Sequence, residues 1–193
     1  MTEDRLRVAI IIGSIRAGRF GPTVANWFAS QASKHGDLDV DIIDLAHTWL
    51  PDMLTNDENI PPPPVKDLAP WLAVADAFVI VTPEHNHSFP ASLKNAIDWF
   101  SDVWKTKPVG FVSYGGRAAG LRAVEALKPV FSELHAVSIR ETVSFHNHAE
   151  QFDASGQPTV PDVCNAAAKN MLDQLVWWAL ALREARAKRP YHS

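Results

Sequence analysis

Apolar runs alternate with amphipathic stripes along the whole chain. Residues 5–12 are almost continuously apolar, which is typical of a strand buried on both faces of a parallel sheet. Residues 91–103 instead place Leu93, Ile97 and Phe100 on one stripe of period 3.6, which predicts a helix. The two patterns predict strands over residues 5–12, 38–45, 75–82, 108–113 and 136–143, and helices over residues 22–36, 65–74, 91–103, 118–131 and 162–187. This alternation predicts a three-layer α/β sandwich with a five-stranded parallel sheet, in a single domain over residues 1–193.

Proline and polar residues mark the connections between these elements. Pro70 argues against the middle of its predicted helix, and Pro129 is expected to interrupt or bend another. Residues 46–64 end in four prolines and are expected to form a stiff loop beside a site. Residues 145–161 form a polar connection with a turn at Ser155-Gly156, and Asp162 is expected to cap the last helix.

The composition is that of an ordinary globular protein, with 47% hydrophobic and 21% charged residues. A net charge of −4 argues against non-specific nucleic-acid binding. The absence of a signal region and of a long apolar span predicts a cytoplasmic protein with no membrane partner. One cysteine excludes an intramolecular disulfide. Of the seven tryptophans, most are expected in the core and some at an interface or pocket.

The loop after the first predicted strand has the composition of an anion cradle. It contains three glycines, the hydroxyl of Ser14 and the guanidiniums of Arg16 and Arg19, directly before a helix. Arginine and helix N-terminal amides both bind phosphate well. The loop matches neither the Gly-x-Gly-x-x-Gly spacing nor a Gly-Lys-Ser/Thr motif, so a P-loop hydrolase is not indicated. A plain turn with solvated arginines is the alternative.

Two further polar loops follow predicted strands. Residues 82–90 offer donors and acceptors that suit the polar edge of a planar heterocycle. They also fit a capped turn, with Ser88 as helix N-cap and Pro90 in the first turn, and both interpretations can hold. Residues 113–116, Ser-Tyr-Gly-Gly, let the backbone approach a ligand closely, or form a simple turn. The pairs His85/His87 and His146/His148 favour loop capping over a metal site, so no metal is expected.

Together these loops resemble the NADPH-dependent FMN reductase family, whose members have the flavodoxin-like fold with strand order 2-1-3-4-5. The most specific match is the run from Pro83 to Trp99, which includes Pro-Glu-His-Asn and Leu-Lys-Asn-Ala-Ile-Asp. The resemblance implies that Ser14, Arg16 and Arg19 bind the FMN phosphate. It also implies that the isoalloxazine ring lies between two groups of residues, Pro83, Glu84, His85 and Asn86 on one side and Ser113, Gly115 and Gly116 on the other.

The resemblance implies an enzyme in which NADPH or NADH reduces bound FMN. The reduced flavin then passes electrons to a quinone, a free flavin, an azo compound or oxygen, so no catalytic side chain is expected. It also implies a homodimer or homotetramer that uses the helix over residues 91–103 and the next helix. The apolar cluster Trp99, Phe100, Val103 and Trp104 fits either such an interface or the core. Two alternatives remain open: a flavodoxin-like electron carrier without NAD(P)H turnover, and a flavin-free binding or regulatory module. The second is kept open by His85, which stands where the family usually has tyrosine.

Overall fold

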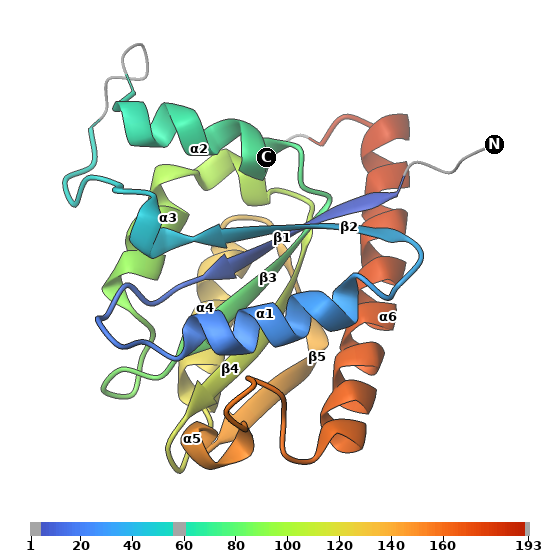
Figure 1. Ribbon diagram of the computed structural model, residues 1–193. Helices are drawn as coiled ribbons and strands as arrows, with labels where there is room; N and C mark the ends of the chain where they lie inside the picture. Colours follow the sequence, from blue (N-terminus) through green and yellow to red (C-terminus); the bar gives the residue numbers. More distant parts are fainter. Residues whose placement is uncertain (1–4, 56–60, 192–193) are drawn as a thin grey trace.

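A five-stranded parallel sheet lies at the centre of the computed structural model, which describes residues 5–55 and 61–191 (Figure 1). The strand order is β2-β1-β3-β4-β5, so the predicted 2-1-3-4-5 order and the flavodoxin-like fold are confirmed. The strands are β1 Leu6–Ile12, β2 Leu38–Asp44, β3 Ala77–Pro83, β4 Pro108–Gly115 and β5 Val137–His146.

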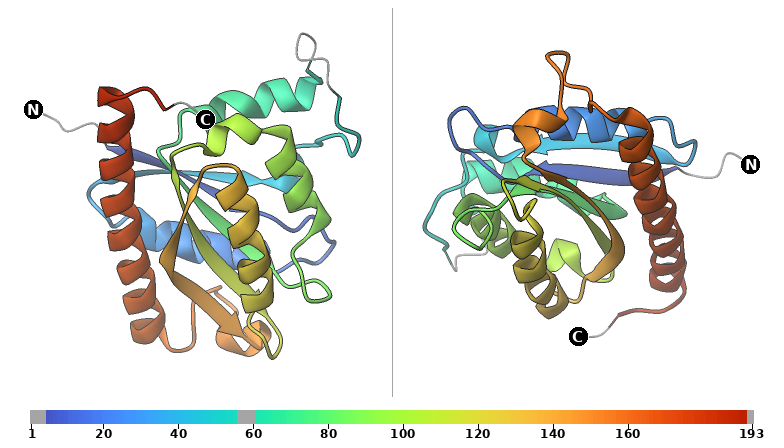
Figure 2. Two further views of the ribbon diagram at one scale, coloured as in Figure 1. Left: turned by 180° about the vertical axis from the view of Figure 1, so that it is seen from behind. Right: turned by 90° about the horizontal axis from the view of Figure 1, so that it is seen from below.

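Helices cover both faces of the sheet, as the two further views in Figure 2 show. The α-helices are α1 Gly21–Ala32, α2 Pro63–Ala73, α3 Ala91–Trp99, α4 Leu121–Glu133, α5 His148–Gln151 and α6 Pro161–Lys188, and the 3₁₀ turns are η1 Leu45–His47 and η2 Ser101–Trp104. Residues of α1 and α6 form one core with the sheet, and residues of α2, α3 and α4 form the other. None of the helices in the described residues is long and apolar enough to cross a membrane.

The central strands are apolar along their length because both faces are covered. Ile10 packs into the core under α1 and α6, whereas its neighbour Ile11 packs into the core under α2 and α3. Both side chains are at most 2% exposed. Successive strand residues point to opposite faces, so a strand with helices on both sides needs an unbroken apolar run.

Proline does not end the helices in which it occurs. α2 continues through Pro70 and α4 continues through Pro129, so of the predicted interruption or bend at Pro129 the interruption does not occur. Each proline removes one i→i−4 hydrogen bond, and each helix still buries a full apolar face. α2 begins at Pro63, inside the segment predicted as loop, and residues 56–60 of that loop lie outside the described residues.

Two other helix predictions need correction. The helix predicted over residues 91–103 ends at Trp99, where Phe100 leaves helical geometry (φ −124°, ψ 44°) and η2 follows. Asp162 lies inside the first turn of α6 and does not cap it, because the N-cap residue is Val160. The predicted turn at Ser155-Gly156 is confirmed, since Gly156 has φ +76° and donates to the Asp153 carbonyl at 3.0 Å.

The tryptophans are less buried than expected. Trp27 and Trp104 lie fully inside the protein, but Trp49, Trp71 and Trp177 are each more than half exposed. Within the predicted interface cluster, Phe100 and Trp104 belong to the core, which leaves Trp99 and Val103 partly exposed. The prediction that most tryptophans are core residues is therefore wrong.

Lys107 is a buried cation at the amino end of β4. Its Nζ donates to the carbonyls of Leu72 and Ala73 at the end of α2, at 3.4 and 2.9 Å, and lies 5.4 Å from the centre of the Phe78 ring. Burial, helped by the positive charge of Arg186, lowers the pKa of Lys107 to about 8. The neutral amine is therefore more favoured in the folded chain than in the unfolded chain.

This shift predicts a pH dependence of stability. Between about pH 8 and the unfolded-chain pKa near 10.4, the unfolded state binds more protons at Lys107, so its contribution to stability rises with pH. We expect the unfolding free energy of the wild type, relative to Lys107→Met, to increase across this range in urea titrations. A constant difference from pH 7 to 10.5 would contradict the assignment.

Candidate functional site

The three predicted loops meet at one edge of the sheet. Ile12 at the end of β1 pairs with Asp44 on β2 and with Val81 on β3, and Thr82 pairs with Ser113 on β4. The segments after β1, β3 and β4 therefore begin at nearly the same level, on the side where these strands end in Figure 1. Open parallel sheets bind ligands outside this edge.

The first loop is tied to the neighbouring elements at its start. The Gly13 N–H donates to the Val81 carbonyl at 2.9 Å, and the Gly13 carbonyl accepts from the Ser92 hydroxyl at 2.7 Å. A Cβ on Gly13 would lie 3.1 Å from a Leu93 methyl carbon, so this close contact favours glycine. The loop thus leaves the sheet in a fixed direction.

The middle of this loop presents donors to solvent. Ser14 is buried, and its hydroxyl oxygen accepts from the Arg16 N–H at 3.4 Å. A turn closed by the Arg19 N–H on the Arg16 carbonyl, at 3.1 Å, places Gly18 at φ +69°. Within the described chain, the N–H groups of Ala17, Gly18 and Phe20 have no protein acceptor. The Arg16 side chain is exposed beside them, and this set of donors suits an anion.

Arg19 is held more firmly than Arg16. Its Nη2 donates to Asp44 Oδ2 at 2.5 Å, and within the described chain its buried Nε has no partner. Beside it lies the buried Tyr114 hydroxyl, and this burial raises the pKa of Tyr114. A Cβ on Gly21 would lie 2.7 Å from an Ile12 methyl and 3.0 Å from the Tyr114 hydroxyl. The first residue of α1 therefore packs directly against the sheet.

The second loop is a tight reversal after β3, which extends one residue further than predicted, to Pro83. His85 and Ser88 exchange backbone hydrogen bonds of 2.9 and 3.0 Å around Asn86 (φ +49°) and His87 (φ +72°). Two central residues with positive φ are typical of a type I′ turn. Ser88 is used in this turn, and α3 has Pro90 as N-cap, so the predicted Ser88 cap is wrong.

Glu84 joins the second loop to α4. Its Oε1 accepts from Arg122 Nη1 at 2.9 Å, whereas its buried Oε2 has no partner within the described residues. The Glu84 side chain is only 12% exposed. A buried carboxylate oxygen without a donor is costly, so this oxygen is a candidate acceptor for a ligand.

The third loop is closed by its own contacts. β4 continues to Gly115, so the predicted tight loop begins later, and the Ser113 hydroxyl donates to the Ala119 carbonyl at 2.8 Å. Gly120 has φ +80°, and a Cβ there would lie 2.8 Å from the Ser113 Cβ. The hydroxyl of Ser113 therefore shapes the loop that Gly115 and Gly116 begin.

Three contacts at the site were not predicted, although the sequence indicates a loop-capping role for His148. Asp44 pairs with Arg19, Arg122 pairs with Glu84, and the His148 ring Nδ1 lies 3.1 Å from the Gly115 carbonyl oxygen. Because a carbonyl only accepts, the Nδ1 of His148 carries the proton in this contact. The Arg19–Asp44 pair depends on strand register, the Glu84–Arg122 pair on how α4 packs, and the His148 contact on the position of α5, none of which a short motif encodes.

A cleft of about 750 Å³ adjoins the first loop. It is lined by Ile15, residues from η1 to Asp52, and the start of α3. One wall is Trp49, which is 80% exposed at φ +52°, and the Pro51 carbonyl accepts from the Asn95 and Trp99 side chains at 3.0 and 2.9 Å. Within residues 5–55 and 61–191, no group of three or more His, Cys, Asp or Glu side chains is placed to hold a metal ion.

Comparisons with known proteins identify the family. The family model for NADPH-dependent FMN reductase matches residues 6–150, which include all three loops. An NADPH:quinone oxidoreductase of Arabidopsis thaliana is 32% identical over 186 residues, covering 92% of this chain and 94% of that protein. An NAD(P)H-dependent FMN reductase of Schizosaccharomyces pombe is 34% identical over 122 residues, and this match spans only 60% of that protein.

Solved structures show the same fold. The flavoenzyme FerB, an NAD(P)H:(acceptor) oxidoreductase from Paracoccus denitrificans, superposes with a TM-score of 0.76 at 25% identity, over 91% of this chain and 98% of that chain. A flavodoxin from Pseudomonas aeruginosa reaches a TM-score of 0.58 at 20% identity, over 89% of this chain and 99% of its own, and shows the fold alone. The family prediction is confirmed: the chain belongs to the NADPH-dependent FMN reductase family.

Proposed function

We propose that this protein is an FMN-dependent NAD(P)H oxidoreductase that passes electrons to a small quinone. The observation that carries the proposal is the family match over residues 6–150, because the anion cradle and both other loops lie inside it. Family membership supports FMN as cofactor and NAD(P)H as co-substrate, and it favours an enzyme over an electron carrier. The quinone acceptor is supported by relatives named NADPH:quinone oxidoreductase and 2-hydroxy-1,4-benzoquinone reductase.

The residues of the first loop fit the phosphate end of FMN. The amides of Ala17, Gly18 and Phe20 have no acceptor among the residues that the structure describes, and the exposed Arg16 adds a charged donor. The Ser14 hydroxyl accepts from the Arg16 N–H and so stabilises the loop. The Arg19 guanidinium is held in place by its ion pair with Asp44. A helix N-terminus with unpaired amides and arginine is well suited to a phosphate dianion.

The second and third loops are proposed to border the flavin ring, with Pro83, Glu84, His85 and Asn86 on one side and Ser113, Gly115 and Gly116 on the other. Asn86 and His87 are exposed at positive φ, and the His85–Ser88 hydrogen bonds fix the backbone of this turn. Arg122 fixes the Glu84 carboxylate, and Ala119 accepts from Ser113 to fix the third loop. When bound, FMN supplies the redox chemistry, accepting hydride from NAD(P)H and giving electrons to the acceptor, so the chain's task is to position and shield it.

The proposal is tested by steady-state turnover. Purified protein supplemented with FMN should oxidise NADPH in the presence of a soluble benzoquinone, with one quinone reduced for each NADPH consumed. The same protein from which bound FMN has been removed should be inactive until FMN is added back. Flavin reduction by NADPH without any quinone turnover would refute the acceptor class, and no NADPH oxidation with any acceptor would refute the enzyme.

His85 is expected to tolerate the tyrosine usual in the family. Its backbone N–H and carbonyl close the turn with Ser88, and its side chain is only partly buried. Because tyrosine keeps both backbone hydrogen bonds, the FMN dissociation constant of His85→Tyr should stay within about threefold of wild type, a change below 1 kcal/mol. Titrations followed by flavin fluorescence measure both dissociation constants. The expectation would be contradicted if the wild type bound no flavin and the His85→Tyr variant did.

We also propose a single domain over residues 1–193 that acts as a homodimer or homotetramer in the cytoplasm. The partly exposed Trp99 and Val103, at the end of α3 and in η2, supply apolar area for contact between copies. Sedimentation velocity tests the assembly, and a monomer at micromolar concentration would overturn it.

A further inference from the structure

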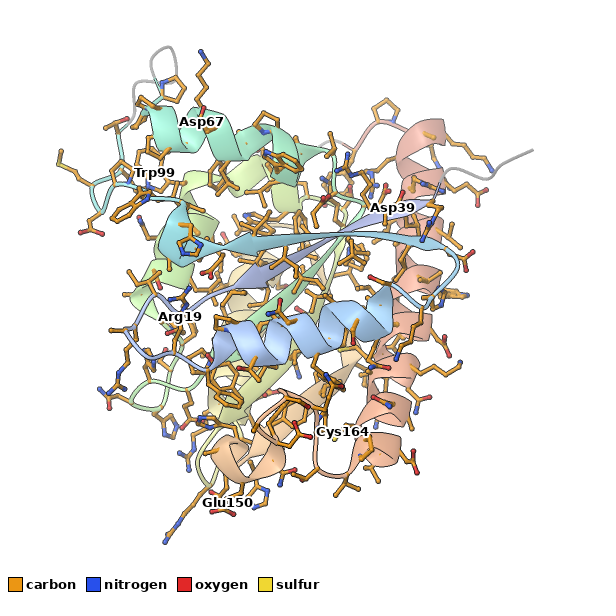
Figure 3. The ribbon with its side chains drawn as sticks, viewed as in Figure 1. Arg19, Asp39, Asp67, Trp99, Glu150 and Cys164 are labelled. Carbon is orange, nitrogen blue, oxygen red and sulfur yellow. The ribbon has the colours of Figure 1, made fainter. Side chains whose placement is uncertain are left out.

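Arg19 and Asp44 form a nearly buried ion pair at the base of the first loop. Arg19, labelled in Figure 3, lies in the loop before α1, and Asp44 is the last residue of β2. Their Nη2–Oδ2 distance is 2.5 Å, and the side chains are 18% and 15% exposed. Such a pair is screened far less by solvent than a surface ion pair.

The Asp44 carboxylate is fixed from two sides. The parallel register places Asp44 opposite Ile12, the last strand residue before the first loop. Its Oδ1 accepts from the Ala46 N–H at 3.1 Å and so caps η1, which leaves Oδ2 directed at Arg19. His47 Nδ1 lies 3.8 Å from the same Oδ2. The sheet and the 3₁₀ turn therefore set the position of Oδ2 independently of the loop.

We propose that Asp44 is a positioning residue for the cofactor phosphate, acting through Arg19; the inference rests on the proposed function. A free arginine side chain samples many rotamers and loses that freedom when it binds a ligand. Asp44 removes most of this freedom before the ligand arrives, because one guanidinium nitrogen is already bonded. The remaining donors of the planar fork then point in fixed directions.

The substitution Asp44→Asn separates the positioning of Arg19 from the capping of η1. Asn is as good a helix cap as Asp, so Asp44→Asn keeps an acceptor for the Ala46 N–H while it removes the charge that holds Arg19. A matched control exists on the same strand. Asp41 pairs with Arg7 at 2.8 Å, and Asp41→Asn removes an equivalent carboxylate three residues earlier.

The test compares two flavins that differ by the phosphate. The full-length chain, freed of flavin, is titrated with FMN and with riboflavin, and binding is followed by quenching of flavin fluorescence. Asp44→Asn should weaken FMN binding about tenfold, the scale of one loosened charge-assisted contact, and leave riboflavin binding unchanged. In an Arg19→Gln background Asp44→Asn should have no further effect on FMN. Asp41→Asn should change neither flavin.

Other outcomes overturn the inference. Tighter FMN binding by Asp44→Asn would show that Asp44 competes with the phosphate for Arg19. Equal weakening of FMN and riboflavin, or a full effect in the Arg19→Gln background, would show a merely structural role. If the wild type binds FMN and the Asp44→Asn variant binds it equally well, only this inference is refuted. If the wild type binds neither flavin, the proposed function is refuted as well.

Discussion

Replacing Arg16 and Arg19 together by alanine is expected to abolish tight FMN binding. Each guanidinium contact with a phosphate is a charge-assisted hydrogen bond of roughly 1.5–3 kcal/mol, so the double variant should lose several kcal/mol of binding free energy. Riboflavin, which lacks the phosphate, should bind the double variant and the wild type equally. Calorimetric or fluorescence titration of both flavins measures the difference.

A surface arginine provides the control for this prediction. Arg140 on the edge strand β5 is exposed and pairs with its neighbour Glu141, so Arg140→Ala should leave both affinities unchanged. Since Arg19→Ala also leaves the Asp44 carboxylate unpaired, thermal unfolding of each variant should accompany the titrations. An equal loss of FMN and riboflavin affinity would place the two arginines outside the phosphate site.

Gly120→Ala is expected to destabilise the protein strongly. Gly120 has φ +80°, and a Cβ would lie 2.8 Å from the Ser113 Cβ and 3.0 Å from the backbone nitrogen and oxygen of Tyr114. A left-handed residue costs roughly 1–2 kcal/mol, and overlap in a packed region typically adds 1–3 kcal/mol. The unfolding free energy should therefore fall by about 3 kcal/mol in urea titrations.

The same loop contains the matched control. A Cβ on Gly116 meets nothing within 4 Å, and Gly116 has no positive φ, so Gly116→Ala should change the unfolding free energy by less than about 0.5 kcal/mol. If Gly120→Ala proved as mild as Gly116→Ala, the tight contact between the third loop and β4 would be wrong.

The fold was predictable because the apolar patterns are local. Residues on both faces of β1 and β3 must be apolar, so these strands stand out as continuous runs, and each interstrand segment carries a helical stripe. The helix ends were less accurate. Phe100 breaks the predicted α3 because its side chain and that of Trp104 turn into the core, a tertiary preference that overrides the local pattern.

The loops of the candidate site were predictable, but their internal contacts were not. Arg19 and the polar residues after β3 are visible in the sequence as a composition. The pairing of Arg19 with Asp44 depends on the register of β1 against β2, and the pairing of Glu84 with Arg122 depends on how α4 packs. Ser113 was predicted to face a ligand, yet its hydroxyl donates to Ala119, which no spacing rule foretells.

The visible spectrum of the purified protein, recorded without oxygen before and after NADPH, tests the central claim most directly. We expect a flavin absorption band from bound FMN that NADPH bleaches and that a quinone restores. A colourless protein that cannot be reconstituted with FMN would contradict it.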